Sequence, residues 1–381
     1  MPARPVSDKL PFMLTLSVTI VAASVLIALQ GKPAASRQTT VDIVNESFHI
    51  DGKPTYAGRT FRGMNLEGLL MNARLVQATF DDLNPQTRAR WDYPDGPWDP
   101  DRNVREFIEA LPSYRAHGLL GFTINFQGGS PQGYSKDQPW INSAFEFDTG
   151  ALRPDYMQRI AAVLDTADRL GMVSIVGLFY FGQEPRFRDE AAILAATDNA
   201  IDFLLARGYR NVLIEIANEC DVGLYKHAII KPGRVVELIR RVKQRSEGKV
   251  RNAAGRFYVS VSFSGGKIPS EQVIGECDFI LLHGNGVGDP ARIAEMVDRV
   301  RAARNYRGQP ILFNEDDHFD FDKPNNHMLA AVSRRAGWGY FDYRMKDEGF
   351  DEGFQSVPVN WRISSARKRG FFTLLREMTG S

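Results

Sequence analysis

The sequence predicts an α/β protein built as a (β/α)₈ barrel, or TIM barrel, with a short N-terminal β-hairpin before it. Three observations predict this fold. Segments that are apolar on both faces alternate with amphipathic helical segments, which is typical of a parallel sheet covered by helices. Eight such apolar segments can be counted. Connections after the strands are often long and those before them are short, as in a barrel whose working face is built from the loops after the strands.

The predicted strands are short apolar runs, several of which end in polar residues. They are expected at 60–66, 120–126, 173–181, 211–219, 257–263, 279–283, 310–315 and 337–342. Helical patterns of usable length accompany seven of them, and the segment after the fifth strand is short. Because parallel strands need crossover connections, these helices are expected to pack outside the sheet.

Glycine residues mark the ends of several predicted helices. Gly118, Gly171 and Gly208 each follow an amphipathic run and precede an apolar strand. Glycine adopts the left-handed conformation that closes a helix at little cost, so these positions are predicted helix stops. In the helix expected at 154–170, apolar residues recur three or four positions apart and Pro154 falls in the first turn.

The segment FHIDGKPTYAG, at 48–58, predicts the N-terminal hairpin. Asp51-Gly52 is a strong two-residue turn signal, and it lies between two short alternating segments. The hairpin is therefore expected to precede the first strand of the barrel.

The first part of the chain differs from the rest in composition. The run from Leu10 to Leu29 carries no charge and follows a short basic segment. It predicts export, as a cleaved signal peptide or as an N-terminal membrane anchor, because it is about as long as a bilayer-spanning helix. We assign residues 1–36 to this segment and its spacer. Residues 41–381 are assigned to a single (β/α)₈ domain that is periplasmic, extracellular or anchored facing outside the cytoplasm.

Charge and cysteine content narrow the classes of function. The chain has 47 Lys and Arg against 46 Asp and Glu, and no long run of like charge. This balance argues against nucleic-acid binding and favours an uncharged or weakly charged partner. Cys220 and Cys277 give no disulfide framework and are expected to stay unpaired. We expect a monomer.

The predicted fourth strand, within NVLIEIANEC at 211–220, ends in polar residues although its body is apolar. Side chains alternate along a strand, so Glu219 and Glu215 are expected on one face and Asn218 on the other. If Glu219 points into the mouth of the barrel, Glu215 lies deeper and needs a partner for its charge. Arg62, on the predicted first strand, is expected to be that partner, which makes Glu215 structural.

The predicted seventh strand ends in the same way, with Asn314 followed by Glu315. Two strands of the barrel therefore each present a glutamate at the carboxyl end. Retaining glycoside hydrolysis needs such a pair, about 5–5.5 Å apart: one carboxylate attacks the anomeric carbon, and the other protonates the leaving oxygen and then activates water. Their surroundings must keep one ionised while the other holds a proton.

These motifs resemble clan A of the glycoside hydrolases, which includes the family 5 cellulases and mannanases. The resemblance rests on IANE and FNE at the ends of strands four and seven and on FRGMNLEG at 61–68. It implies that Glu219 is the acid/base and Glu315 the nucleophile of an enzyme that cleaves β-linked glycans with retention. It also implies that Asn218 hydrogen-bonds a sugar hydroxyl and that His283 lies near the nucleophile.

Further candidate substrate ligands lie at the ends of other predicted strands. They are Asn125 and Gln127 on strand two, Tyr180 on strand three, and Trp338 and Asp342 on strand eight. Trp338 is a candidate platform for a sugar, and Asp342 either binds substrate or pairs with Arg344. Aromatic residues of the long loops, such as Tyr134 and Trp140, either stack on sugars or pin the loops to the barrel.

Two other functions stay open at this point. The acidic segment 315–318 with His283 could bind a divalent metal in a metal-dependent hydrolase or isomerase, although adjacent residues on a strand diverge. A carbohydrate-binding barrel without turnover is the other alternative, and the presence of both carboxylates argues against it. We predict an oligo- or polysaccharide partner, no cofactor and no metal in the site.

Overall fold

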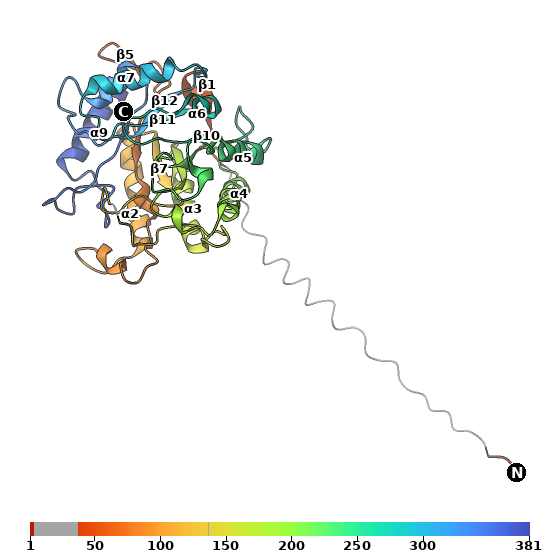
Figure 1. The fold of residues 1–381 in the computed structure, drawn as a ribbon. Coiled ribbons are helices and arrows are strands. Elements are labelled where there is room, and N and C mark those ends of the chain that lie inside the picture. Colours follow the sequence, from red (N-terminus) through yellow and green to blue (C-terminus); the bar gives the residue numbers. More distant parts are fainter. Residues whose placement is uncertain (4–36, 136) are drawn as a thin grey trace. The chain divides into compact units, whose positions relative to one another are not determined.

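Parallel strands form the wall of a barrel in the computed structural model (Figure 1). The structure describes residues 1–3, 37–135 and 137–381. The strands of the wall are β6 (Asn72–Arg74), β7 (Gly121–Asn125), β8 (Val173–Phe179), β9 (Val212–Ala217), β10 (Tyr258–Ser260), β11 (Ile280–His283), β12 (Ile311–Glu315) and β13 (Gly339–Tyr340). Six of them form one sheet in the order β10, β9, β8, β7, β6, β13, and β11 pairs with β12. Each of these ladders is parallel.

Short contacts between these two sheets close the wall. A parallel bridge joins Leu312 of β12 to Gly337, just before β13. On the other side, the amide of Asp278, before β11, donates to the carbonyl of Val259 on β10 at 2.9 Å. The predicted (β/α)₈ barrel is thereby confirmed.

Helices lie around the strands (Figure 1). The α-helices are α2 (Pro100–Ala116), α3 (Pro154–Arg169), α4 (Glu190–Ala206), α5 (Val236–Ser246), α6 (Glu271–Glu276), α7 (Pro290–Arg301), α8 (His327–Ser333) and α9 (Ala366–Thr379). Short 3₁₀ helices are η2 (Val76–Thr79), η3 (Arg88–Trp91), η4 (Glu184–Arg186) and η5 (Ala228–Ile230). Gly118, Gly171 and Gly208 follow α2, α3 and α4 with φ of 90°, 67° and 69°, which confirms the predicted helix stops.

The first strand of the barrel is β6, and the prediction of that strand at 60–66 is wrong. That segment forms an antiparallel ribbon of β4 (Thr60–Phe61) and β5 (Met64–Asn65). Arg62 and Gly63 between them have φ of 49° and 77°, so the chain reverses there instead of continuing as a strand.

The predicted N-terminal hairpin is present and belongs to a three-stranded sheet of β1 (Val41–Val44), β2 (Ser47–Ile50) and β3 (Lys53–Pro54). Asp51 and Gly52 form its turn with φ of 51° and 75°. Val41 and Phe48 of this sheet pack into an apolar cluster with strand residues of the barrel. The barrel members of this cluster are Leu70, Leu120, Val173, Ile175, Leu213, Tyr258, Phe279, Leu281 and Leu312. The small sheet therefore covers the amino-terminal end of the barrel.

Beyond this apolar floor, the inside of the wall is polar. Asn314 donates to Oε2 of Glu215 at 3.3 Å. Asn125 on β7 and Gly177 on β8 are paired in the register, and a Cβ added at Gly177 would lie 2.2 Å from Oδ1 of Asn125. Glycine is therefore required there, and a level of polar side chains lies beneath the carboxyl ends of the strands.

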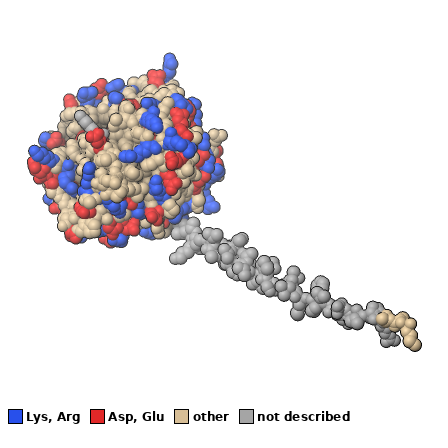
Figure 2. All heavy atoms as spheres, turned by 60° about the horizontal axis from the view of Figure 1, so that its bottom comes forward, with Lys and Arg blue, Asp and Glu red and all other residues tan. Residues whose placement is uncertain are grey.

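The described residues bear on four predictions about the chain as a whole: its division into parts, the N-terminal apolar run, the cysteines and the balance of charge. Residues 37–381 form one compact unit. The apolar run at 10–29 lies outside the described residues, and none of the helices that the structure does describe is long and apolar enough to cross a membrane. Cys220 and Cys277 are buried and unpaired, as expected. The face drawn in Figure 2 shows Lys and Arg interspersed with Asp and Glu rather than separated into patches.

Candidate active site

Glu219 lies two residues beyond the end of β9, and the chain turns at this residue. The strand ends at Ala217, and Glu219 has a φ of 51° instead of an extended value. Its amide donates to Oγ of Ser262 at 2.9 Å, and the same hydroxyl donates to Oε1 of Glu215 at 2.6 Å. Ser262 thus fixes the end of β9 against the segment that follows β10.

Arg74, at the end of β6, joins the acidic residues of the site. Its Nε lies 2.7 Å from Oε2 of Glu315, and its Nη1 lies 3.8 Å from Oε2 of Glu215. Its Nη2 donates to Oδ1 of Asn218 at 2.7 Å. Burial disfavours the charge of this guanidinium, which is 1% exposed, but Glu315 and Glu215 outweigh burial and raise the pKa of Arg74 above its ordinary value. The site therefore contains a permanent buried cation.

Two predictions about this region are wrong. The partner of Glu215 is Arg74, whereas Arg62 is exposed on the turn between β4 and β5. Asn218 does not face away from Glu219, because its side chain contacts the same guanidinium that contacts Glu315. The turn at Glu219 ends the strict alternation of side chains that the prediction assumed.

Glu315 is the last residue of β12 and is held by one ion pair and one hydrogen bond. Nε of Arg74 forms the ion pair with its Oε2, and Nδ2 of Asn285 donates to its Oε1 at 2.6 Å. Only 5% of Glu315 is exposed. Burial raises the pKa of Glu315 above its ordinary value and the charge of Glu219 adds to the rise, while Arg74, His283 and Asn285 oppose it.

His283 connects the two carboxylates. Its Nδ1 lies 2.9 Å from Oε1 of Glu219 and 3.7 Å from Oε2 of Glu315. One ligand atom from each of the three residues lies within 4.8 Å of the others. Burial lowers the pKa of His283, but the charges of Glu315 and Glu219 outweigh burial and hold that pKa above its ordinary value. The structure thus brings Glu219, Glu315, His283 and Asn218 together around Arg74.

Asn285 and Tyr134 extend this network across the mouth of the barrel. Nδ2 of Asn285 also donates to the hydroxyl of Tyr134 at 2.7 Å, and that hydroxyl donates to Oδ2 of Asp317 at 3.0 Å. Tyr134 comes from the long loop after β7 and is 60% exposed, while Trp140 of the same loop is 1% exposed and pins it. The sequence singled out Tyr134 as an aromatic residue but gave no signal for its contact with Asn285.

Three further predicted ligands lie deeper than the carboxylates or in the loop scaffold. Asn125 is buried at the level of Glu215 in the register. Gln127 donates to Oγ of Ser143 at 3.3 Å and accepts the amide of Tyr180 at 3.1 Å, so both ends of its amide hold loops. The hydroxyl of Tyr180 is buried and accepts a backbone amide of the loop after β7. Burial, and then the charge of Glu315, raises the pKa of Tyr180.

Trp338 does not reach the mouth of the barrel. It is fully buried, and its Nε1 donates to Oδ2 of Asp316 at 2.8 Å. The neighbouring Gly339 takes the inward position, because a Cβ there would lie 2.4 Å from Oδ1 of Asn72. Trp338 therefore points away from the inside of the barrel, and the structure gives it no face on which a sugar could stack.

Asp342 is also buried away from the carboxylate pair. Its Oδ1 lies 3.0 Å from Nη2 of Arg367 on α9, and its Oδ2 accepts the amide of Gly353 at 3.2 Å. The predicted alternative partner, Arg344, instead donates to backbone carbonyls of the loop that follows β13. Asp342 thus holds that loop to α9.

Glu315 does not converge with the residues at 316–318 on a single site. Glu315 contacts Arg74 and Asn285, whereas Asp316 contacts His318, with Oδ1 2.7 Å from Nδ1. Neighbouring residues at the end of β12 point in different directions, as expected for a strand. The metal-dependent hydrolase built on this segment and His283 therefore lacks a common ligand sphere among the residues that the structure describes.

The comparisons with known proteins bear on the fold. No protein-family model and no curated protein matches the sequence. A GH5-4 broad-specificity endoglucanase from Bacteroides salanitronis is 12% identical with a TM-score of 0.52, covering 81% of this chain and 92% of that one. A family 5 mannosidase from Rhizomucor miehei is 13% identical with a TM-score of 0.52, covering 91% and 99%.

Two more solved structures are similar to this chain. An endo-1,4-beta-mannanase from Eisenia fetida is 12% identical with a TM-score of 0.51, covering 90% of this chain and 96% of that one. A Bacteroides vulgatus protein is 15% identical with a TM-score of 0.50, and this chain, 89% of which is covered, spans 61% of its length. The protein therefore has the fold of the family 5 glycoside hydrolases of clan A.

Proposed function

We propose that the protein is a retaining glycoside hydrolase that cleaves O-glycosidic bonds by double displacement through Glu219 and Glu315. The observation that carries this proposal is the spacing of the two glutamates. A carboxylate oxygen of Glu219 lies within 4.8 Å of a carboxylate oxygen of Glu315. Retaining enzymes hold their carboxyl groups about 5–5.5 Å apart, whereas inverting enzymes need about 6.5–9.5 Å to admit a water. A closest oxygen–oxygen separation of at most 4.8 Å leaves little room for an attacking water between the two groups and so supports retention.

Glu315 is the proposed nucleophile. Burial raises the pKa of Glu315, and the charge of Arg74 and the N–H group of Asn285 oppose that rise because both stabilise the ionised carboxylate that must attack. In the first step, an oxygen of Glu315 bonds to the anomeric carbon as the bond from that carbon to the glycosidic oxygen breaks. The leaving oxygen takes the proton of Glu219, and a glycosyl ester on Glu315 remains.

Glu219 is the proposed acid/base. Its side chain is 15% exposed against 7% for that of Glu315. Glu219 is therefore the more accessible of the two to the water that enters in the second step. In the second step, Glu219 takes a proton from water, the water oxygen bonds to the anomeric carbon, and the ester bond to Glu315 breaks. His283 hydrogen-bonds Glu219, and its imidazole can also gain or lose a proton. The charge of His283 therefore influences this proton transfer.

Asn218 is the proposed sugar ligand beside the cleavage point. Its Oδ1 already accepts from Arg74, so its Nδ2 is the group available to a sugar hydroxyl. Because Arg74 also contacts Glu315, it sets the position of the amide relative to the nucleophile.

The proposed substrate is an oligo- or polysaccharide with β-linkages. Solved structures with this fold include proteins described as an endoglucanase, a mannanase and a mannosidase, which supports glucan and mannan as the first substrates to test. The steps above balance in atoms and electrons with carboxylates and water alone, so we propose no cofactor. The uncharged N-terminal run supports action outside the cytoplasm, free or anchored.

The test separates hydrolysis from binding alone. Purified protein is incubated with β-glucan and β-mannan oligosaccharides and aryl β-glycosides, and the first product is examined by proton NMR for its anomeric configuration. We expect retained configuration and a loss of at least about a thousandfold in Glu315→Ala. Glu109→Ala, an exposed glutamate on α2, is the control and should match the wild type.

Two results would contradict the proposal. A product of inverted configuration, or unchanged hydrolysis by Glu315→Ala, would show that Glu315 is not the nucleophile. If the wild type binds oligosaccharides by calorimetry but hydrolyses none of the panel, the carbohydrate-binding alternative is favoured.

A further inference from the structure

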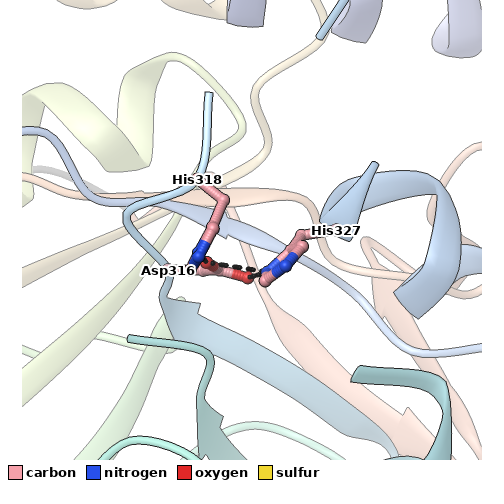
Figure 3. Close-up of side chains that lie close together, drawn as sticks. All are labelled: Asp316, His318 and His327. Atoms are coloured by element: carbon pink, nitrogen blue, oxygen red, sulfur yellow. Dashed lines mark hydrogen bonds and ion pairs between the residues drawn. The ribbon is translucent and has the colours of Figure 1, made fainter. Parts of the chain in front are cut away.

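One aspartate and two histidines converge next to the proposed catalytic pair but do not belong to it (Figure 3). Asp316 follows the last residue of β12, His318 lies two residues further, and His327 is the first residue of α8. Nδ1 of His318 lies 2.7 Å from Oδ1 of Asp316, and Nδ1 of His327 lies 2.9 Å from Oδ2. The two imidazole rings stack with centroids 3.7 Å apart.

The carboxylate of Asp316 has no fixed counterion among the residues that the structure describes. It is fully buried, and no Lys or Arg among the described residues lies within 4.0 Å of it. Glu315, by contrast, has the guanidinium of Arg74 beside it. A buried carboxylate needs a compensating positive charge, because burial without one is costly.

The donor atoms suit a divalent transition metal. Each of the three residues offers one ligand atom, and these atoms lie within 4.8 Å of one another. Two imidazole nitrogens and one carboxylate oxygen form a three-ligand set that Zn²⁺ commonly takes in proteins. A single ion would satisfy both Nδ1 atoms and the carboxylate together, whereas two stacked imidazolium cations would repel each other.

Neighbouring groups support such a site. Nε1 of Trp338 donates to Oδ2 of Asp316 at 2.8 Å, which fixes the orientation of the carboxylate. The side chain of His318 is 26% exposed, so an ion can enter from solvent. Oδ1 of Asp317 lies 3.5 Å from Nδ1 of His318, close enough to supply a further oxygen.

We propose that Asp316, His318 and His327 bind one divalent metal ion, for which zinc is the best match. The ion holds the segment between β12 and α8 to the barrel wall. It plays no part in the steps assigned to Glu219 and Glu315, so the proposal stands independently of the proposed function.

Metal content tests the proposal directly. Tag-free full chain is incubated with zinc chloride, desalted and analysed by plasma mass spectrometry. We expect about one zinc per chain, and a melting temperature that falls by several degrees when a chelator removes it. His318→Gln and His327→Gln should lose the zinc. His49→Gln, on β2, and His283→Gln, beside the catalytic pair, should keep it.

The zinc X-ray absorption spectrum of the wild type covers the case in which the cluster variants fail to fold. Two imidazole nitrogens and oxygen ligands, unchanged in His283→Gln, are expected. The proposal is overturned if the zinc-treated wild type holds less than about a tenth of an ion per chain. A proton on one of the two histidines would then be the charge that compensates the carboxylate of Asp316. The proposal is also overturned if the bound zinc shows no imidazole ligands or disappears in His283→Gln.

Discussion

Nε of Arg74 lies 2.7 Å from Oε2 of Glu315, although β6 and β12 are not neighbours in the sheet order. The same guanidinium reaches Glu215 and Asn218 on β9 and just beyond it. One buried cation therefore connects the ends of the two strands that carry the proposed catalytic carboxylates.

Replacing Arg74 by lysine should damage both stability and activity. Lysine keeps the charge but cannot contact three groups with one planar fork, so Glu215 or Glu315 loses its partner. We expect a loss of about 2–4 kcal/mol in the free energy of unfolding, measured with urea, and at least about a tenfold loss in kcat/KM. Arg62→Lys, on the exposed turn, is the matched control and should change neither. Equal effects of the two substitutions would refute the role given to Arg74.

The effect of Glu219→Ala should depend on the leaving group. Only substrates with poor leaving groups need a proton from the acid, so we expect kcat/KM to fall by about 10²–10⁴-fold for an unactivated oligosaccharide and far less for a dinitrophenyl glycoside. Added azide should restore turnover of the activated substrate by replacing water in the second step. A uniform loss on both substrates would argue against Glu219 as the acid/base.

His283→Gln should move the acidic limb of the pH profile. The positive charge of His283 lowers the pKa of Glu315, so its removal lets that pKa rise further. Glu315 must be ionised to attack, and the acidic limb of kcat/KM reports that ionisation in the free enzyme. The limb should therefore shift to higher pH. A limb that stays in place or moves to lower pH would show that His283 does not act on Glu315 through its charge.

Asn285→Ala should lower kcat/KM more than Tyr134→Phe. Asn285 donates directly to Glu315, and a hydrogen bond to a charged group contributes about 1.5–3 kcal/mol, or roughly 10–150-fold in rate. Among the residues that the structure describes, the hydroxyl of Tyr134 bonds to Asn285 and Asp317 and not to Glu315, so its loss should matter by about tenfold at most. Steady-state kinetics of the two variants will rank them, and the reverse order would place the tyrosine, not the amide, next to the reacting sugar.

Much of the candidate site could be predicted from the sequence, because its polar residues lie at the ends of apolar runs. Glu219 and Glu315 each end an apolar run, and parallel strands bring their carboxyl ends to one face of a barrel. His283 ends the predicted sixth strand, and its place near the nucleophile followed from the resemblance to family 5. The side-chain directions of Asn218 and Glu219 could not be predicted, because the backbone of Glu219, with φ of 51°, ends the alternation of side chains.

Other features depended on contacts that a linear pattern does not show. Arg74 lies in a strand of three residues, and the segment at 60–66 has a similar mixture of polar and apolar residues that predicts a strand just as well. His327 reaches Asp316 from a different element, 11 residues away. Trp338 belongs next to a two-residue strand, which is too short for its inward and outward faces to be read from alternation.

Covalent trapping of Glu315 shows directly whether this glutamate is the nucleophile. The folded part of the chain is incubated with activated 2-fluoro β-glycosides and examined by intact mass and peptide mapping. We predict one glycosyl group attached to Glu315 and none in Glu315→Ala, because the fluorine slows the second step and the ester accumulates. An adduct on another residue, or turnover of these compounds without an adduct and with inverted product, would contradict this prediction.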